Sequence, residues 1–223
     1  MKDANNKLLW RTIFSDSKYR PILISAGLFL CFNLGVLIPT FIYSTLLKKD
    51  AVSINLAGRQ RMLSQKMTKS LLEVKNQQEA GDSFQDSQEE LNQSYKLFDD
   101  ALKGFQIGKS IKGADGESVY LKAVETQRGR EILREAVEIW TPYKEKLQPV
   151  LKADKLIQSK DLQPAVAYAR ENNLKLLGLM NDLTIEQEKV AQTKSGYLQL
   201  IQLAGMALAL GNFFVLLSRS FKR

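Results

Sequence analysis

The chain has 223 residues, 32 of them basic and 24 acidic, and a formal net charge of +8 with no histidine. A chain this basic could bind nucleic acid, but the two tails (1–20 and 219–223) each carry three net positive charges, so nucleic acid is not expected as a partner. Lack of histidine excludes Ser-His and Cys-His nucleophiles and removes the commonest metal ligand. We therefore expect no catalytic residue, no metal site and no cofactor.

The first distinct element is an uncharged run of 27 residues, 21–47. About 20 apolar residues suffice for a helix to cross a hydrocarbon core, so the run predicts a first transmembrane helix. A cleaved signal peptide is the alternative, but the apolar region is too long and no small-residue cleavage site follows it cleanly. The only cysteine, Cys31, lies within this run. It therefore forms no intrachain disulfide and is expected to be a packing residue.

A second uncharged run, 195–218, predicts a second transmembrane helix. The short tails outside the two runs are basic, and basic segments next to a span stay in the cytoplasm. We therefore expect a protein of the lipid bilayer with a cytoplasmic N-terminal tail (1–20), a cytoplasmic C-terminal tail (219–223) and an extracytoplasmic segment (48–194).

The extracytoplasmic segment is expected to be helical, with helices near 48–79, 83–105, 117–150 and 160–194. No run alternates with period two for long enough to predict a strand. The first and last helices should continue into the transmembrane helices. These elements predict an all-α protein, an antiparallel up-down four-helix bundle continuous with two transmembrane helices.

Each of the four helices has an apolar face that should form the bundle core. The last helix has a heptad pattern, which is typical of left-handed bundle packing. The expected core residues are Leu56, Leu63, Met67, Leu71 and Val74 in the first helix; Phe84, Leu91, Phe98, Leu102 and Phe105 in the second; and Val119, Ala123, Leu133, Val137, Trp140, Leu147 and Leu151 in the third. The heptad seam of the last helix consists of Leu162, Val166, Ala169, Asn173, Leu176, Met180, Leu183, Gln187, Val190, Lys194 and Tyr197, in which Asn173 and Gln187 are polar interruptions.

The first helix of the bundle has a second stripe, nearly opposite its core face, formed by Ile54, Gly58, Arg61, Gln65 and Leu72. A bundle helix needs only one buried stripe, so the second one predicts a partner helix. The commonest partner is a second copy of the chain, related by a twofold axis that places Arg61 opposite its counterpart. Paired guanidinium groups over a glycine gap suit a small planar oxyanion.

A structural interpretation of the same residues remains open. Arg59, Arg61, Lys66 and Lys69 could form a solvated basic face beside the membrane that meets anionic lipid headgroups. Under this interpretation the positive charges have no specific ligand. The sequence pattern alone favours this interpretation over the anion site.

The segment 54–65, Ile-Asn-Leu-Ala-Gly-Arg-Gln-Arg-Met-Leu-Ser-Gln, resembles the PilJ-type sensor domain. This domain occurs in type IV pilus methyl-accepting chemotaxis transducers and is related to the sensor domain of nitrate/nitrite sensor kinases of the NarX and NarQ type. The segment 167–181 resembles the last helix of the same domain. The resemblance implies that Gly58 and Arg61 of both protomers bind nitrate or nitrite, with Arg59, Gln65 and Ile54 as further candidates. Arg59 and Gln60 are closer to the pilus transducers than to the kinases.

The resemblance implies a sensory module of the bacterial inner membrane with a periplasmic bundle. The 223 residues include no HAMP linker, kinase or methyl-accepting region after the second span, which leaves two alternatives. The chain is either a sensor without its own output domain, which acts through a full-length chemotaxis transducer or a sensor kinase, or part of a longer system. The alternative is a non-sensing docking protein of an envelope or pilus-associated complex. An enzyme is not expected, because the helical carboxylates are typical of solvated faces; these are Glu89, Glu90, Asp99, Asp100, Glu186 and Glu188.

Overall fold

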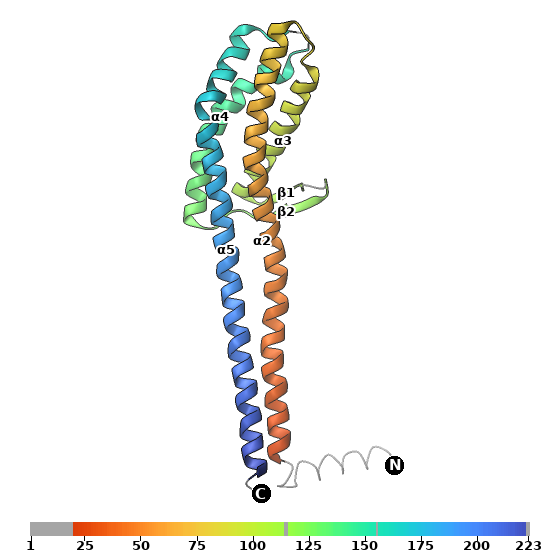
Figure 1. Ribbon diagram of the computed structural model, residues 1–223, viewed down its shortest axis with the longest axis vertical. Helices are drawn as coiled ribbons and strands as arrows, with labels where there is room; N and C mark the ends of the chain where they lie inside the picture. Colours follow the sequence, from red (N-terminus) through yellow and green to blue (C-terminus); the bar gives the residue numbers. More distant parts are fainter. Residues whose placement is uncertain (1–19, 114–115, 155, 222–223) are drawn as a thin grey trace, which may run out of the picture. The chain divides into compact units, whose positions relative to one another are not determined.

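The computed structural model describes residues 20–113, 116–154 and 156–221 (Figure 1). Its elements in chain order are α2 (Arg20–Ala80), α3 (Gln85–Ile107), β1 (Lys109–Lys112), β2 (Ser118–Leu121), α4 (Gln127–Lys152) and α5 (Ser159–Phe221). The four long helices confirm the predicted all-α fold class. Residues 1–19 and 222–223 of the two expected tails lie outside the described part.

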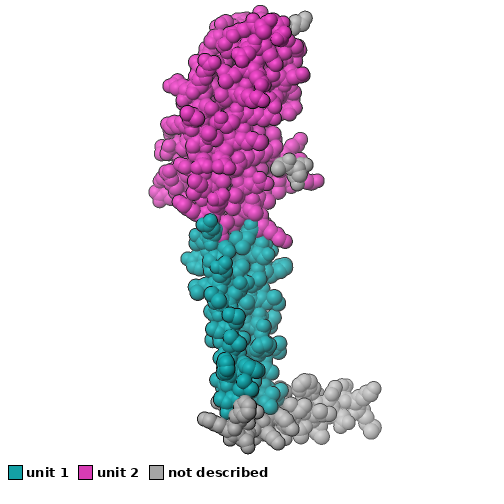
Figure 2. Space-filling model, in the orientation of Figure 1, with its two compact units in different colours: residues 1–47, 192–223 teal, residues 48–191 magenta. Residues whose placement is uncertain are grey.

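The chain forms two compact units, which are coloured separately in Figure 2. The first unit comprises residues 1–47 and 192–223, and the second comprises residues 48–191. Helices α2 and α5 contribute to both units. Each unit has its own packing.

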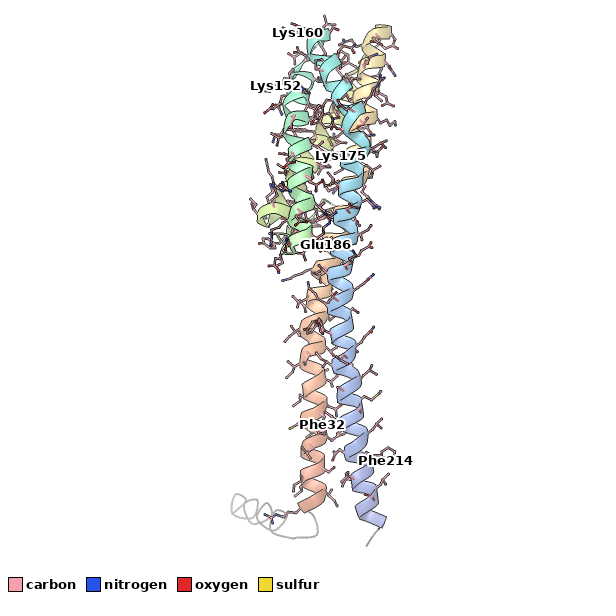
Figure 3. The ribbon with its side chains drawn as sticks, turned by 90° about the vertical axis from the view of Figure 1, so that its left-hand side faces the viewer. Phe32, Lys152, Lys160, Lys175, Glu186 and Phe214 are labelled. Atoms are coloured by element: carbon pink, nitrogen blue, oxygen red, sulfur yellow. The ribbon has the colours of Figure 1, made fainter. Side chains whose placement is uncertain are left out.

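In the first unit, the segments of α2 and α5 pair through polar side chains and one glycine (Figure 3, in which Phe32 and Phe214 are labelled on these segments). The Ser25 hydroxyl donates to Asn212 Oδ1 at 2.7 Å, and Asn212 Nδ2 donates to the Ser25 carbonyl at 2.9 Å. A Cβ added to Gly205 would overlap the Val36 side chain, so the two helices need the small residue there. Hydrogen-bonded polar groups and small residues are the means by which helices associate in lipid.

Both helices are long and apolar enough to cross a membrane, over Ile22–Ala80 and Ser159–Ser218. Almost none of the apolar stretch in either helix is buried within the chain. Core helices of soluble proteins show the opposite, because their apolar residues are mostly buried. Two such helices fit a protein that spans a membrane.

In the second unit, segments of the four helices pack as an antiparallel bundle in which each helix contacts its neighbours along the chain, and α5 closes against α2 (Figure 1). One side-chain contact illustrates each interface: Lys66 with Glu90 for α2–α3, Asp99 with Lys144 for α3–α4, Tyr168 with the Ile139 carbonyl for α4–α5, and Arg61 with Asn181 for α5–α2. This arrangement is the up-down bundle that the sequence predicts.

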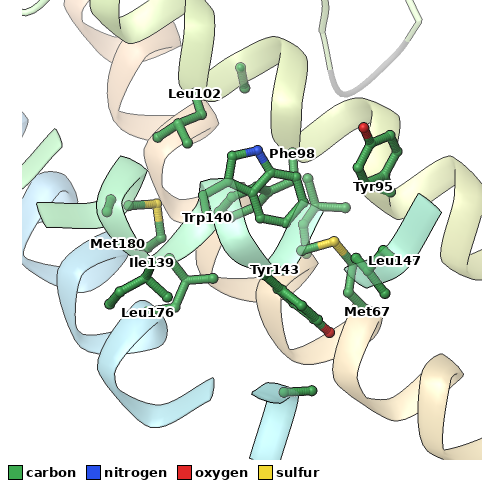
Figure 4. Packing of buried hydrophobic residues seen from close by; sticks show 14 of the residues in the cluster. Met67, Tyr95, Phe98, Leu102, Ile139, Trp140, Tyr143, Leu147, Leu176 and Met180 are labelled. Atoms are coloured by element: carbon green, nitrogen blue, oxygen red, sulfur yellow. The ribbon is translucent and has the colours of Figure 1, made fainter. Parts of the chain in front are cut away.

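The core of the bundle contains most of the predicted residues. Most of the core residues expected on the four helices are buried, and several are fully enclosed. Val119, Ala123, Val137, Leu151 and Val190 are only half-buried, and Tyr197 is exposed. Val119 lies in a strand of the hairpin rather than in a bundle helix, and Tyr197 belongs to the first unit rather than to the bundle. At the centre, the Trp140 ring packs on Phe98 with 4.6 Å between ring centroids and on Tyr143 with 5.8 Å (Figure 4). Large aromatic side chains contribute much of the buried apolar area in a core of this size.

Asp99 fastens α3 to α4 at the edge of this aromatic cluster. Its carboxylate accepts from Trp140 Nε1 at 2.9 Å, from Lys144 at 3.0 Å and from Lys103 at 2.7 Å. Burial alone would raise the pKa of Asp99, but these hydrogen bonds hold the pKa below its ordinary value. Asp99 is thus a structural carboxylate.

The β-hairpin between α3 and α4 corrects the sequence-based expectation of helix from residue 117 and of no strand. β1 pairs antiparallel with β2, from Lys109 opposite Leu121 to Lys112 opposite Ser118. The strands have four residues each, which is too short for an alternating pattern to be recognised. Helix α4 begins only at Gln127.

The start of α4 depends on Gly129 because two side chains occupy the space where its Cβ would lie. The Thr126 side chain caps α4 by accepting from the Gly129 N–H at 3.1 Å. A Cβ on Gly129 would lie 2.8 Å from Thr126 Oγ1 and would overlap the Val124 side chain. Only a glycine therefore fits between the hairpin and the first turn of α4.

We expect Gly129→Ala to lower the free energy of unfolding by about 1–3 kcal/mol, the usual cost of overpacking. Thermal unfolding followed by circular dichroism measures this change. Gly178→Ala is the control, because a Cβ on Gly178 meets nothing within 4 Å and alanine in a helix interior should stabilise by roughly 0.5–1 kcal/mol. Equal unfolding temperatures for the two variants would contradict the packing described for Gly129.

Candidate anion site

The second stripe of α2 lies beside α5 in the bundle and forms one wall of a surface groove. The groove has a volume of about 580 Å³. Gly58, Arg61, Met62 and Gln65 of α2 form one wall, and the facing residues of α5 form the other, namely Leu174, Leu177, Gly178 and Asn181. The helices run antiparallel here, so residues far apart in the sequence share one surface.

Arg61 is the only charged residue that lines the groove. Its side chain is exposed, and Nη1 donates to Asn181 Oδ1 at 2.8 Å. Within the described ranges, no ion pair involves Arg61. The guanidinium group therefore keeps its full charge and most of its five donors available to an anion.

The other three cations of the possible basic face are engaged elsewhere in the bundle. Lys66 pairs with Glu90 at 3.0 Å, and Lys69 pairs with Glu73 at 3.5 Å. Arg59 Nη1 donates to the Gly113 carbonyl of the hairpin loop at 2.8 Å. Arg59, Lys66 and Lys69 therefore each have a separate partner outside the groove. Of the four cations, Arg61 is the one that lines the groove.

A polar network lies one turn further along the groove. Gln65 Nε2 donates to Asn173 Oδ1 at 2.9 Å, and the Thr68 hydroxyl lies 3.2 Å from the same oxygen. Asn173 thereby connects the exposed Gln65 to the buried Thr68. The network sets the position of the Gln65 amide on α2.

Gly58 is not required by packing within one chain. A Cβ added at this position meets nothing within 4 Å, and the same holds for Gly178 across the groove. Glycine in a helix interior is destabilising relative to alanine by roughly 0.5–1 kcal/mol. A glycine that costs stability and leaves space on the surface is typical of close approach by a ligand or another backbone.

The structure places the sequence-predicted site residues in two groups. It brings Gly58, Arg61 and Gln65 together in the groove, whereas Arg59 contacts the hairpin and Ile54 is half-buried outside the groove lining. The structure also places Asn173 and Asn181 next to the stripe, and neither is among the site residues predicted from the sequence. For Asn173, its polar side chain in the heptad seam of the last helix was the available signal, whereas Asn181 lies outside that seam.

The groove can bind but has no catalytic apparatus. Its lining holds one cation, two amide side chains, two bare glycines and three apolar residues. Across the ranges that the structure describes, no cluster of metal-ligating side chains occurs. A permanently charged planar donor beside amide donors suits an oxyanion, because a guanidinium group can donate two parallel hydrogen bonds to its oxygens.

An all-α bundle together with two helices able to cross a membrane defines a candidate membrane-anchored helical domain. The family model described as type IV pili methyl-accepting chemotaxis transducer N-terminal domain, PilJ, matches residues 43–165, more than half of the chain. The chain belongs to this family, which is a sensory family rather than a catalytic one. Among curated proteins and solved structures, none matches the chain.

Proposed function

We propose that the protein senses a small planar oxyanion, with nitrate or nitrite as the candidates, which binds between the Arg61 side chains of two chains. The observation that carries the proposal is the groove in which Arg61 is the only charged lining residue and in which, among the residues that the structure describes, its guanidinium group has the neutral Asn181 as its one hydrogen-bond partner. An anion offers this guanidinium group a stronger, charge-assisted partner than an amide oxygen does.

The size of the groove supports a site shared by two chains. Cavities of about 300–1,000 Å³ hold drug-sized ligands, so an anion of three or four atoms fills only a small part of 580 Å³. The groove rim also exposes Met62 (54 %) and Leu174 (76 %). A second copy would bury both residues and form the missing wall of the site. A twofold axis through the groove brings the two Arg61 side chains together, and the anion offsets their repulsion.

The proposed membrane arrangement follows from charge and hydropathy. Residues 21–47 and 195–218 span the bacterial inner membrane, both tails (1–20 and 219–223) are cytoplasmic, and residues 48–194 form the periplasmic sensor bundle. The basic tails support this orientation, since basic flanks remain on the cytoplasmic side.

Binding is proposed to reach the cytoplasm as a shift of α2 relative to α5. Both helices contribute to the groove and to the apolar segments, so a change in one region can be carried along a rigid helix. The receiving partner is a full-length chemotaxis transducer or a sensor kinase that carries an output region. Gly211 of α5 has nothing within 4 Å of an added Cβ and offers a place for a partner helix to pack closely.

Disulfide cross-linking tests the shared site. In a Cys31→Ser background, we expect Gln65→Cys to cross-link efficiently to its counterpart in membranes, because a twofold contact brings identical exposed residues together. Nitrate should raise the yield severalfold by stabilising the pair of chains.

Two controls define the outcome of this experiment. Leu63 is buried in the core, so Leu63→Cys should not cross-link. Glu145 is exposed on a different helix, α4, so Glu145→Cys measures the cross-linking that arises from random collision. A yield for Gln65→Cys no higher than that for Glu145→Cys would refute the arrangement. A high yield that does not respond to nitrate or nitrite would instead favour a docking protein without a sensory anion.

A further inference from the structure

Gln60 is the most unusual buried side chain in the bundle. It is completely buried, and neither Nε2 nor Oε1 has a hydrogen-bond partner within the described part of the chain. Among the residues that the structure describes, Gln77 leaves one buried amide oxygen without a hydrogen-bond partner, whereas Gln60 leaves both amide atoms without one. An unpaired buried amide opposes the arrangement in which it occurs, because the group gives up its hydrogen bonds to water without replacement.

The two neighbours of Gln60 restrain α2 at this level on either side. Arg59 donates to the Gly113 carbonyl of the hairpin loop, and Arg61 donates to Asn181 of α5, each at 2.8 Å. Both are single hydrogen bonds to neutral oxygens, and the Arg61 bond lies in the open groove. These two modest restraints add to the core packing and the ion pair with Glu90 that hold α2, in a position that its own buried Gln60 disfavours.

We propose that Gln60 is a positioning residue that keeps α2 poised between two arrangements. In the arrangement seen here, the bond between Arg61 and Asn181 adds to the packing that holds α2, and the Gln60 amide is unsatisfied. An anion that takes Arg61 from Asn181 removes one restraint, and α2 then shifts to an arrangement in which Gln60 is hydrogen-bonded. The coupling to the anion rests on the proposed function, whereas the destabilising effect of Gln60 does not.

This device accounts for how a small anion could move a long helix. A ligand shifts an equilibrium only by its difference in affinity for the two states, so the states must already be close in free energy. If the Gln60 amide were fully hydrogen-bonded in the arrangement without anion, that arrangement would be strongly favoured. The unsatisfied amide reduces that preference, and binding at one exposed arginine then suffices to change the population.

The chain supplies a matched control on the same helix, Gln78. Its Nε2 donates to the Ile157 carbonyl at 2.9 Å, and its Oε1 accepts from the Ile157 N–H at 2.8 Å. Methionine is close to glutamine in size and shape but does not form strong hydrogen bonds. Gln60→Met should therefore remove an unpaired amide, and Gln78→Met should break two good hydrogen bonds.

The first arm of the experiment measures the unfolding temperature of the 223-residue chain in detergent, without anion. We expect Gln60→Met to raise this temperature by roughly 2–4 °C and Gln78→Met to lower it by a similar amount. A lower unfolding temperature for Gln60→Met would overturn the proposal, because it would mean that the Gln60 amide is hydrogen-bonded in the native arrangement, for example through water.

The second arm titrates both variants and the wild type with sodium nitrate by calorimetry. Gln60→Met should weaken nitrate binding about threefold to tenfold, since it stabilises the arrangement without anion, and Gln78→Met should leave the affinity unchanged. Equal affinities for wild type and Gln60→Met would overturn the coupling. Failure of the wild type to bind nitrate would refute the proposed function, and the first arm would still decide the role of Gln60.

Discussion

Arg61→Ala is expected to weaken nitrate binding by about a hundredfold or more, without unfolding the bundle. Hydrogen bonds to charged groups contribute roughly 1.5–3 kcal/mol each, and a twofold site loses two guanidinium groups with one substitution. The Arg61 side chain is exposed and makes one hydrogen bond, to Asn181, so its removal should change the unfolding temperature little. Isothermal titration calorimetry with sodium nitrate measures the loss.

Arg61→Lys tests whether geometry as well as charge is required. Lysine keeps the positive charge but lacks the planar fork, so we expect nearly the same loss of affinity as for alanine. Arg134→Ala is the control, because Arg134 is an exposed arginine on α4 that does not line the groove. Its Nη1 lies 3.4 Å from Glu138 Oε1. Wild-type affinity in Arg61→Ala, or an equal loss in Arg134→Ala, would remove Arg61 from the site.

Gly58→Ala should change folding and binding in opposite directions. Within one chain the added methyl group meets nothing, so alanine should stabilise α2 by roughly 0.5–1 kcal/mol. In the proposed dimer the same methyl group lies where the second helix or the anion approaches. We expect a higher unfolding temperature for the monomer together with nitrate binding at least about tenfold weaker.

Gly196→Ala on α5 controls for the gain in helix propensity. A Cβ at Gly196 also meets nothing within 4 Å, and Gly196 does not line the groove. Gly196→Ala should raise the unfolding temperature as Gly58→Ala does and leave the nitrate affinity unchanged. If Gly58→Ala bound nitrate as the wild type does, the space at Gly58 would have no role in the site.

The parts of this fold that the sequence predicted are those set by apolar periodicity. Helix faces repeat every three or four residues, so a helix such as α5 shows its buried side over many turns, from Leu162 to Leu183. Long uncharged runs likewise identify the two helices able to cross a membrane. The family match to residues 43–165 agrees with the resemblance carried by the segment 54–65.

The parts that the sequence did not predict depend on single contacts. The hairpin has strands too short to show a period, and the contact between Arg59 and the Gly113 carbonyl exists only because that hairpin folds beside α2. The partners Asn181 and Asn173 lie more than 100 residues from Arg61 and Gln65. Gln60 lies on the apolar side of α2, and only the packed structure shows its amide without a partner.

The stoichiometry of nitrate binding tests the central claim most directly. In calorimetric titration of the purified wild-type chain, with its oligomeric state measured by sedimentation in the same detergent, an anion shared by two Arg61 side chains predicts one nitrate for every two chains. Nitrite should give the same ratio if the site recognises planar oxyanions. One anion bound for each chain, or no binding of nitrate or nitrite to a dimer of correctly folded chains, would contradict the shared anion site.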